Sequence, residues 1–295
     1  MQSAHAEVSR LPLLSRVPSP ALVLGAIASV QVGSAVATKL FAQVGPAGAS
    51  LLRLGWASVI LLALWRPRLR GMTRRQWVLA ITFGVVLAAM NTAFYAAIDR
   101  IPLGVGVTIE FIGPLAVAVG GSRRPRNLMW AALAAAGILA LMHGGTHGLN
   151  MLGVLLALLA GAMWAAYILV NAQLGRAFDT GSGLAIAMSV GALAALPLGV
   201  VEGGAHLVSP RSLALGAAVG ILSSAIPYSL EMEALRRITT SLFGVLMSLE
   251  PAMAALAGFV LIGQQLSARA LLGIALVVVA SVGASRSSRQ ASVAP

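Results

Sequence analysis

The apolar residues of this chain form long, nearly unbroken runs separated by short polar loops. Each run is close to the roughly 20 residues that a helix needs to cross the hydrocarbon layer of a membrane. The pattern therefore predicts about ten membrane-spanning helices, of which the fifth is the shortest. Their approximate positions are 20–41, 45–65, 77–98, 102–121, 128–143, 151–174, 182–201, 212–233, 239–262 and 267–284.

Basic residues alternate between the two predicted sides of the membrane. One side of the membrane has only Arg100, Arg211 and Arg269 in its loops. Lys39 and Arg53 lie just inside the face on that side, where they are expected to anchor at the interface. Cytoplasmic loops are enriched in Lys and Arg, so both termini are predicted to be cytoplasmic. The basic residues on the cytoplasmic side are Arg10, Arg16, Arg66, Arg68, Arg70, Arg74, Arg75, Arg123, Arg124, Arg126, Arg176, Arg236, Arg237, Arg286 and Arg289.

Composition supports a membrane protein and excludes a soluble one. Hydrophobic residues make up 59% of the chain and charged residues 9%, against about 25% charged in a soluble domain. The net charge of +12 would suggest nucleic-acid binding in a soluble protein. Here the arginines lie at helix ends, where anionic lipid headgroups are the expected contact, so no nucleic-acid partner is expected.

The first run has an alternative interpretation as a cleavable signal peptide. Arg10 and Arg16 precede it, and Ala35-Val36-Ala37 resembles a cleavage site. Cleavage would leave nine spans and put Lys39 at the new terminus. An uncleaved first span is therefore the favoured interpretation.

The two halves of the chain resemble each other. Arg100-Ile101 before the fourth run matches Arg237-Ile238 before the ninth, and the same offset places Pro114 on Pro251. Chance matching in an apolar background is the alternative explanation.

Two units of five helices each must have opposite orientations, because five is odd. Such inverted repeats are common in secondary transporters, whose substrate site lies near mid-membrane between the repeats. The predicted fold class is an all-α integral membrane protein with ten transmembrane helices in two inverted five-helix repeats. The repeats would span 20–147 and 148–284, between a cytoplasmic N-terminal segment, 1–19, and a cytoplasmic tail, 285–295.

Two glutamates lie near the middle of predicted spans, where an ionisable group needs a partner or water. Glu110 precedes Pro114 and Glu250 precedes Pro251, and a proline frees a backbone carbonyl one turn earlier. We favour a role for both glutamates in a substrate cavity. The alternative is that they are protonated or paired and only hold helices together.

Other polar and aromatic residues fall at similar depths and repeat along helix faces. Asn91 and Tyr95 are four residues apart, and Trp164, Tyr167 and Asn171 follow a spacing that puts them on one stripe. Glu231 and Glu233, in contrast, are expected to pair locally with nearby arginines or to form a gate contact, rather than to bind substrate. The predicted cavity residues are Gln31, Ser34, Asn91, Tyr95, Glu110, Trp164, Tyr167, Asn171, Tyr228, Ser248 and Glu250, and the predicted helix hinges are Pro114, Pro227 and Pro251.

Motifs for catalysis and cofactor binding are absent from the sequence. His143 and His147 have metal-like spacing, but they lie in a glycine-rich loop, and no metal site is expected. There is no Gly-x-Ser-x-Gly elbow and no Walker loop. We therefore expect neither an enzyme nor a bound cofactor. Any active transport would be coupled to an ion gradient, with protons as one option, or to the substrate's own gradient.

Several strings resemble the drug/metabolite transporter superfamily of the EamA type, and within it the bacterial threonine/homoserine exporter branch. They are Gly-Pro-Leu-Ala-Val-Ala at 113–118, Ser-Arg-Arg-Pro at 122–125, Pro-Tyr-Ser-Leu-Glu-Met at 227–232 and Met-Ser-Leu-Glu-Pro-Ala-Met-Ala-Ala at 247–255. The resemblance covers essentially the whole chain. One departure is that relatives usually carry Gly-Glu after the ninth span, whereas here Gly263 is followed by Gln264 and Gln265.

The resemblance implies a ten-helix, inverted-repeat exporter of amino acids or similar small metabolites in a bacterial inner membrane. Its central cavity would be lined by the first, third, fourth, sixth, eighth and ninth helices. Two alternatives remain open. One is proton-coupled efflux of drugs or other metabolites, and the other is a membrane scaffold that transports nothing.

Overall fold

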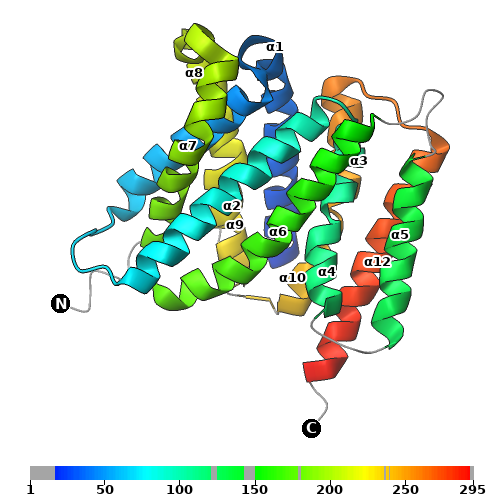
Figure 1. Cartoon of the computed structure of the whole chain (residues 1–295). Coiled ribbons are helices and arrows are strands. Elements are labelled where there is room, and N and C mark those ends of the chain that lie inside the picture. The colour runs from blue at the N-terminus through cyan, green and yellow to red at the C-terminus, as the bar shows by residue number, and fades with distance from the viewer. Residues whose placement is uncertain are drawn as a thin grey trace.

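The computed structural model describes residues 17–120, 125–142, 150–178, 181–235, 237–238 and 240–292, and every regular element in these ranges is helical. Within them, the side chains of 118–120, 125–128, 141–142, 228–229, 232, 235, 240–241 and 284–292 are not described. The elements are α1 (Ser19–Trp65), α2 (Arg74–Ile98), α3 (Leu103–Glu110), α4 (Ile112–Gly120), α5 (Pro125–Met142), α6 (Met151–Ala177), α7 (Ser182–Gly203), η2 (Gly204–Val208), α8 (Pro210–Gly220), η3 (Ile221–Ala225), α9 (Ile226–Leu235), α10 (Thr240–Met247), α11 (Glu250–Ala257), η4 (Gly258–Ile262) and α12 (Ala268–Ser292) (Figure 1).

Five helical segments are long and apolar enough to cross a membrane by length and composition. They are Ser19–Trp65, Arg74–Ile98, Met151–Ala177, Ser182–Val208 and Leu242–Ile262. Shorter apolar helices cover Leu103–Val117, Met129–Ala140 and Ala268–Gly283. The prediction of an all-helical membrane fold is confirmed at this level, whereas the number of ten crossings stays a prediction.

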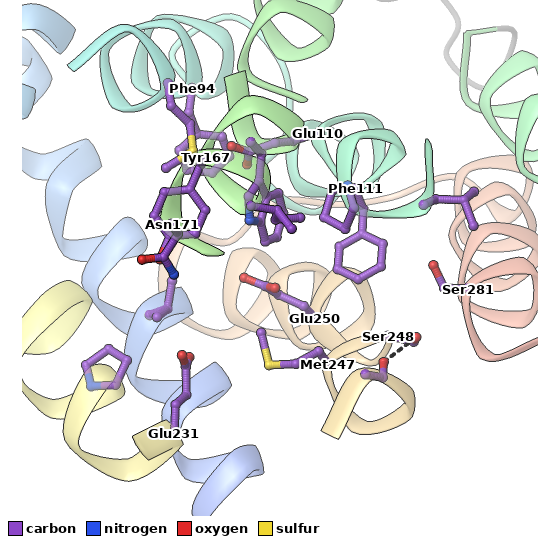
Figure 2. A pocket seen from close by; sticks show the side chains of 18 of the residues that line it. Phe94, Glu110, Phe111, Tyr167, Asn171, Glu231, Met247, Ser248, Glu250 and Ser281 are labelled. Atoms are coloured by element: carbon purple, nitrogen blue, oxygen red, sulfur yellow. Dashed lines mark hydrogen bonds between the residues drawn. The ribbon is translucent and has the colours of Figure 1, made fainter. Parts of the chain in front are cut away.

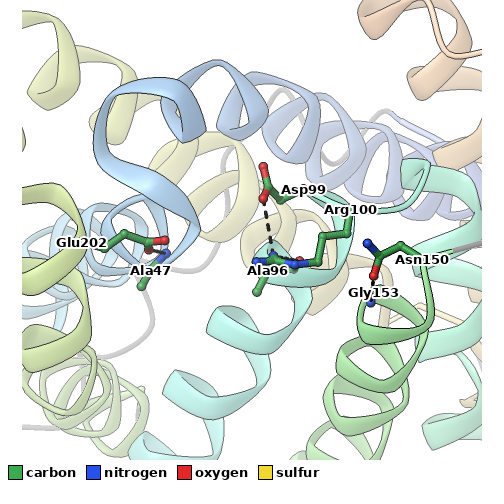
Figure 3. A network of polar contacts seen from close by, with 7 residues as sticks. All are labelled: Ala47, Ala96, Asp99, Arg100, Asn150, Gly153 and Glu202. Carbon is green, nitrogen blue, oxygen red and sulfur yellow. Dashed lines mark hydrogen bonds and ion pairs between the residues drawn. The ribbon is translucent and has the colours of Figure 1, made fainter.

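The longest helix, α1, is interrupted at the point that separates the first two predicted spans. Gly45 has φ 67° and ψ 171°, outside the helical region, and Pro46 follows it. The backbone N–H of Ala47 donates to Glu202 Oε2 at 2.6 Å, as Figure 3 shows. A glutamate from α7 therefore satisfies a donor that the break leaves exposed at the start of the second part of α1.

Three of the predicted spans are not single continuous α-helices. The fourth breaks at Phe111, between α3 and α4, and the ninth breaks at Ser248 and Leu249, between α10 and α11. In the eighth, the π-helical turn η3 lies between α8 and α9. These interruptions lie within the apolar segments and leave backbone groups free for other contacts.

Close packing of small residues joins the broken helices to the rest of the bundle. α3 packs on α6 and α11, α1 packs mainly on α7 and α8, and α5 pairs with α12 at one edge (Figure 1). A Cβ on Gly104 would lie 2.6 Å from the Cα of Ala255. Glycine lets the two backbones approach where lipid provides no hydrophobic driving force between helices.

Candidate functional site

A cavity of about 470 Å³ opens among the broken helices. Volumes of this order are typical of small-molecule sites, which combine apolar walls with a few polar groups. Figure 2 shows Glu110, Glu231 and Glu250 approaching this space from three different elements. The lining residues are Val30, Arg53, Met90, Asn91, Phe94, Glu110, Phe111, Pro114, Leu115, Trp164, Tyr167, Ile168, Asn171, Ser223, Pro227, Glu231, Phe243, Gly244, Met247, Ser248, Glu250 and Ser281.

Glu250 is held by a specific contact at the edge of the cavity. It is the first residue of α11, directly after the α10–α11 break, and is 7% exposed. Gln31 Nε2 on α1 donates to Glu250 Oε1 at 3.2 Å. Within the described part of the chain, Glu250 Oε2 has no hydrogen-bond partner. One carboxylate oxygen is thus fixed by α1, and the other is buried beside the cavity that Glu250 lines.

Glu110 is positioned by a close backbone approach. It is the last residue of α3 and is also 7% exposed. Pro114 has no N–H to donate to the carbonyl of Glu110, four residues earlier, so the helix opens there. A Cβ on Gly161 of α6 would lie 2.8 Å from that carbonyl oxygen. The contact between α6 and the break fixes where the Glu110 side chain enters the cavity.

Aromatic and amide side chains form much of the remaining wall. The rings of Trp164 and Phe111 meet edge to face, with centroids 5.5 Å apart. Tyr167 stacks on Phe83, with centroids 4.9 Å apart. Asn91 Nδ2 donates to the carbonyl of Leu87 at 2.8 Å, which orients this amide from its own helix. Such rings give a ligand apolar contact without closing the cavity to polar groups.

The structure brings most, but not all, of the predicted site residues to the cavity. Pro114, Pro227 and Ser248 line it, and Ser248 Oγ donates to the carbonyl of Gly244 at 2.9 Å. The Tyr228 side chain lies outside the described residues. Four predicted residues are buried behind the wall rather than in the lining, namely Gln31, Ser34, Tyr95 and Pro251.

Two charged residues line the cavity that the sequence places elsewhere. Arg53 is expected as an interfacial anchor, but its side chain reaches the cavity. Glu231 is expected in a local pair or a gate contact, and it lines the cavity. Glu233 makes the expected local ion pair, with Arg237. Hydropathy indicates the depth of a residue but not the direction of its side chain. The only signal in the sequence that Arg53 could line the cavity is therefore its depth.

The π-helical turn η3 explains how Arg53 is held. Pro227 lacks the N–H that would pair with the carbonyl of Leu222 in a π-helix or with that of Ser223 in an α-helix. Ser29 Oγ donates to the Leu222 carbonyl at 2.6 Å, and Arg53 Nη2 donates to the Ser223 carbonyl at 3.2 Å. One proline therefore creates two acceptors that α1 uses.

No metal site is found in the parts of the chain that the structure describes, because they contain no group of three or more His, Asp or Glu side chains that could hold an ion. His143 and His147 lie outside the described residues.

Comparisons with known proteins relate the chain to transporters. Residues 151–286 match the model of the EamA-like transporter family. The chain is 40% identical over 273 residues to the threonine/homoserine exporter RhtA of Escherichia coli K12, covering 92% of each protein. It is 30% identical over 240 residues to the uncharacterized transporter YwfM of Bacillus subtilis, covering 78% of this chain and 80% of that protein.

The fold also has a counterpart among solved structures. One crystal structure matches with a TM-score of 0.62, covering 92% of this chain and 98% of the other. The two sequences are 19% identical, so this likeness concerns the fold alone. The similar proteins named by function are exporters and transporters, not enzymes.

Proposed function

Because the chain belongs to the EamA-like transporter family, we propose that it exports amino acids through its central cavity by alternating access. The substrates would be threonine, homoserine or other neutral amino acids, including aromatic ones. The similarity to the threonine/homoserine exporter RhtA over 92% of the chain supports this class of substrate.

The single observation that carries the proposal is the position of two glutamates at helix breaks that border one cavity. Glu110 ends α3 and Glu250 begins α11, and both line the 470 Å³ space. A carboxylate in a desolvated site is a strong partner for an ammonium group. Glu110 and Glu250 would bind the amino group of the substrate, next to the wall formed by Asn91 and Trp164.

Alternating access follows from the same breaks. Discontinuous helices let one half of a transporter move against the other around a fixed site. We assign the halves to the inverted repeats 20–147 and 148–284. In this arrangement ten helices cross a bacterial inner membrane, and both termini are cytoplasmic, in accord with the alternation of basic loops.

A second candidate function is proton-coupled efflux of cationic drugs or metabolites. Three carboxylates, those of Glu110, Glu231 and Glu250, line the cavity and would attract cations. Protons would then be the coupling ion. This function predicts that lipophilic amines, and not amino acids, compete for transport.

Counterflow in proteoliposomes tests the proposal directly. Vesicles loaded with unlabelled threonine are expected to accumulate external labelled threonine above protein-free vesicles, and homoserine is expected to compete. Accumulation of no amino acid, aromatic ones included, would overturn the proposal. A protein that transports nothing but purifies in fixed ratio with a partner would instead support a scaffold.

A further inference from the structure

Arg53 lines the cavity but has no role in the binding of an ammonium group by the glutamates. It lies on the second part of α1, is half-buried, and lines the cavity with Glu110, Glu231 and Glu250. Among the lining residues that the structure describes, it is the only basic one. The cavity therefore has a cationic group as well as anionic ones.

The guanidinium of Arg53 is held by neutral groups on two other helices. Arg53 Nη1 donates to the hydroxyl of Tyr95 at 3.3 Å, and its Cζ lies 5.7 Å from the centroid of the Tyr95 ring. Arg53 Nη2 donates to the Ser223 carbonyl at 3.2 Å. Tyr95 is fully buried at 0% exposure, so it supports Arg53 from behind. These contacts help to fix the position of the guanidinium at the cavity.

The carboxylates come from other elements. Glu110 on α3 and Glu250 on α11 both interact electrostatically with Arg53, and Glu250 also interacts with Glu110 and Glu231. One cavity is thus lined by a basic side chain from α1 and by acidic side chains from other elements.

We propose that Arg53 binds the carboxylate of the transported amino acid while Glu110 and Glu250 bind its ammonium group. Arginine presents parallel N–H groups that match the two oxygens of a carboxylate. The cavity would then select zwitterions and discriminate against amines that lack the carboxylate. This inference rests on the proposed export of amino acids and adds the residue that sets its specificity.

The inference also separates the two candidate functions. A cavity lined only by carboxylates would favour cations of many kinds. A fixed guanidinium repels cations, because like charges in a desolvated site are costly, and it attracts a carboxylate. Removal of Arg53 should therefore shift the preference from amino acids toward amines rather than weaken both alike.

Competition assays on wild-type protein and the Arg53→Gln variant test this shift. Counterflow of labelled threonine is measured in proteoliposomes against unlabelled threonine and against 1-amino-2-propanol, which is threonine without its carboxylate. Wild-type protein should prefer threonine strongly. In Arg53→Gln the apparent affinity for threonine should fall by about 30-fold or more, as expected for the loss of a buried charged partner, while the affinity for the amine holds or rises.

Two further variants serve as controls. Lys39→Gln removes one positive charge from the same helix at an exposed position outside the lining, and it should leave both affinities unchanged. Arg53→Lys keeps the charge but loses the paired N–H geometry, so it should recover part of the threonine affinity. If Arg53→Gln does not fold, Arg53→Lys alone should still weaken threonine more than the amine.

Different outcomes separate this inference from the proposed function. Wild-type protein that exchanges no amino acid would overturn amino-acid export itself. Wild-type exchange with an unchanged threonine affinity in Arg53→Gln, or an equal loss for threonine and the amine, would overturn the assignment of Arg53 and leave export intact. Equal loss in Lys39→Gln would show that general surface charge, and not the cavity, sets the preference.

Discussion

The α3–α4 break and the α10–α11 break each carry a glutamate, but they hold it at opposite ends of a short helix. Glu110 ends α3, whereas Glu250 begins α11. The backbone of a helix is partly negative at its C-terminus and partly positive at its N-terminus. The partial charge of the backbone therefore disfavours a carboxylate anion at Glu110 and favours one at Glu250. Gln31 also donates a hydrogen bond to the Glu250 carboxylate.

The position of the proline accounts for this difference. Pro114 follows Glu110 by four residues, so the carbonyl it leaves open is that of Glu110 itself. Pro251 follows Glu250 directly and stands in the first turn of α11, where a proline is well tolerated. Similar strings thus create two sites, and we expect Glu110 to depend more strongly on a substrate ammonium or a proton than Glu250 does.

The Glu110→Gln substitution should have the largest effect on transport. It keeps the size of the side chain but removes its negative charge, which the helix end stabilises less at Glu110 than at Glu250. We expect kcat/KM for threonine to fall by about 100-fold, the cost of losing a buried charged partner, as measured by initial rates of counterflow. Rates near those of wild-type protein would exclude Glu110 as the ammonium partner.

The Glu250→Gln substitution should have a smaller effect, about tenfold, because part of its network survives. The amide oxygen can still accept the hydrogen bond from Gln31, so α1 and α11 remain joined. The same counterflow assay measures this effect. A loss as large as that of Glu110→Gln would show that the two breaks are equivalent, contrary to the distinction drawn from helix ends.

The Gly161→Ala substitution should disturb the Glu110 break through packing alone. The added Cβ would lie 2.8 Å from the Glu110 carbonyl oxygen, so backbone has to move. We expect a destabilisation of about 1–3 kcal/mol, typical of overpacking, measured by thermal unfolding in detergent. Gly175→Ala on the same helix is the matched control, because its Cβ would meet nothing within 4 Å. Equal stability of the two variants would contradict the close approach.

The Gln264→Ala substitution should have the smallest effect. Gln264 Oε1 accepts from the backbone N–H of Leu103 at 2.9 Å, at the start of α3 and far from Glu110 at its end. The loss of this helix-end contact should cost about 1 kcal/mol, and Gln264→Glu should restore it because a carboxylate also accepts this bond. Unfolding measurements that show no difference between the two variants would rule out the contact.

Helix positions follow closely from the sequence, because a chain in lipid must satisfy its backbone within helices. The apolar runs 77–98 and 151–174 correspond to Arg74–Ile98 and Met151–Ala177. The π-helical turn at Ile221–Ala225 could not be predicted from hydropathy. Its carbonyls accept hydrogen bonds from Ser29 and Arg53 of α1, which are distant in the sequence.

The lining of the cavity follows only in part from the sequence, because side-chain direction also depends on tertiary packing. Asn91, Trp164 and Asn171 were identified from their depth and spacing, and the structure places them at the cavity. Arg53 was not, because the direction of its side chain depends on a carbonyl 170 residues away. Tyr95 has the right depth but faces Arg53 instead of the cavity. Depth can be read from a sequence, whereas rotation about the helix axis depends on tertiary packing.

Substrate protection of a single cysteine in the cavity tests the central claim most directly. The chain has no cysteine, so Asn171→Cys introduces a unique thiol at the cavity wall, with Arg68→Cys in the exposed α1–α2 loop as control. Threonine should slow maleimide labelling at position 171 over the same concentrations that saturate transport, and should leave position 68 unaffected. Labelling at position 171 that threonine does not change at saturating concentration would contradict the assignment of this cavity as the substrate site.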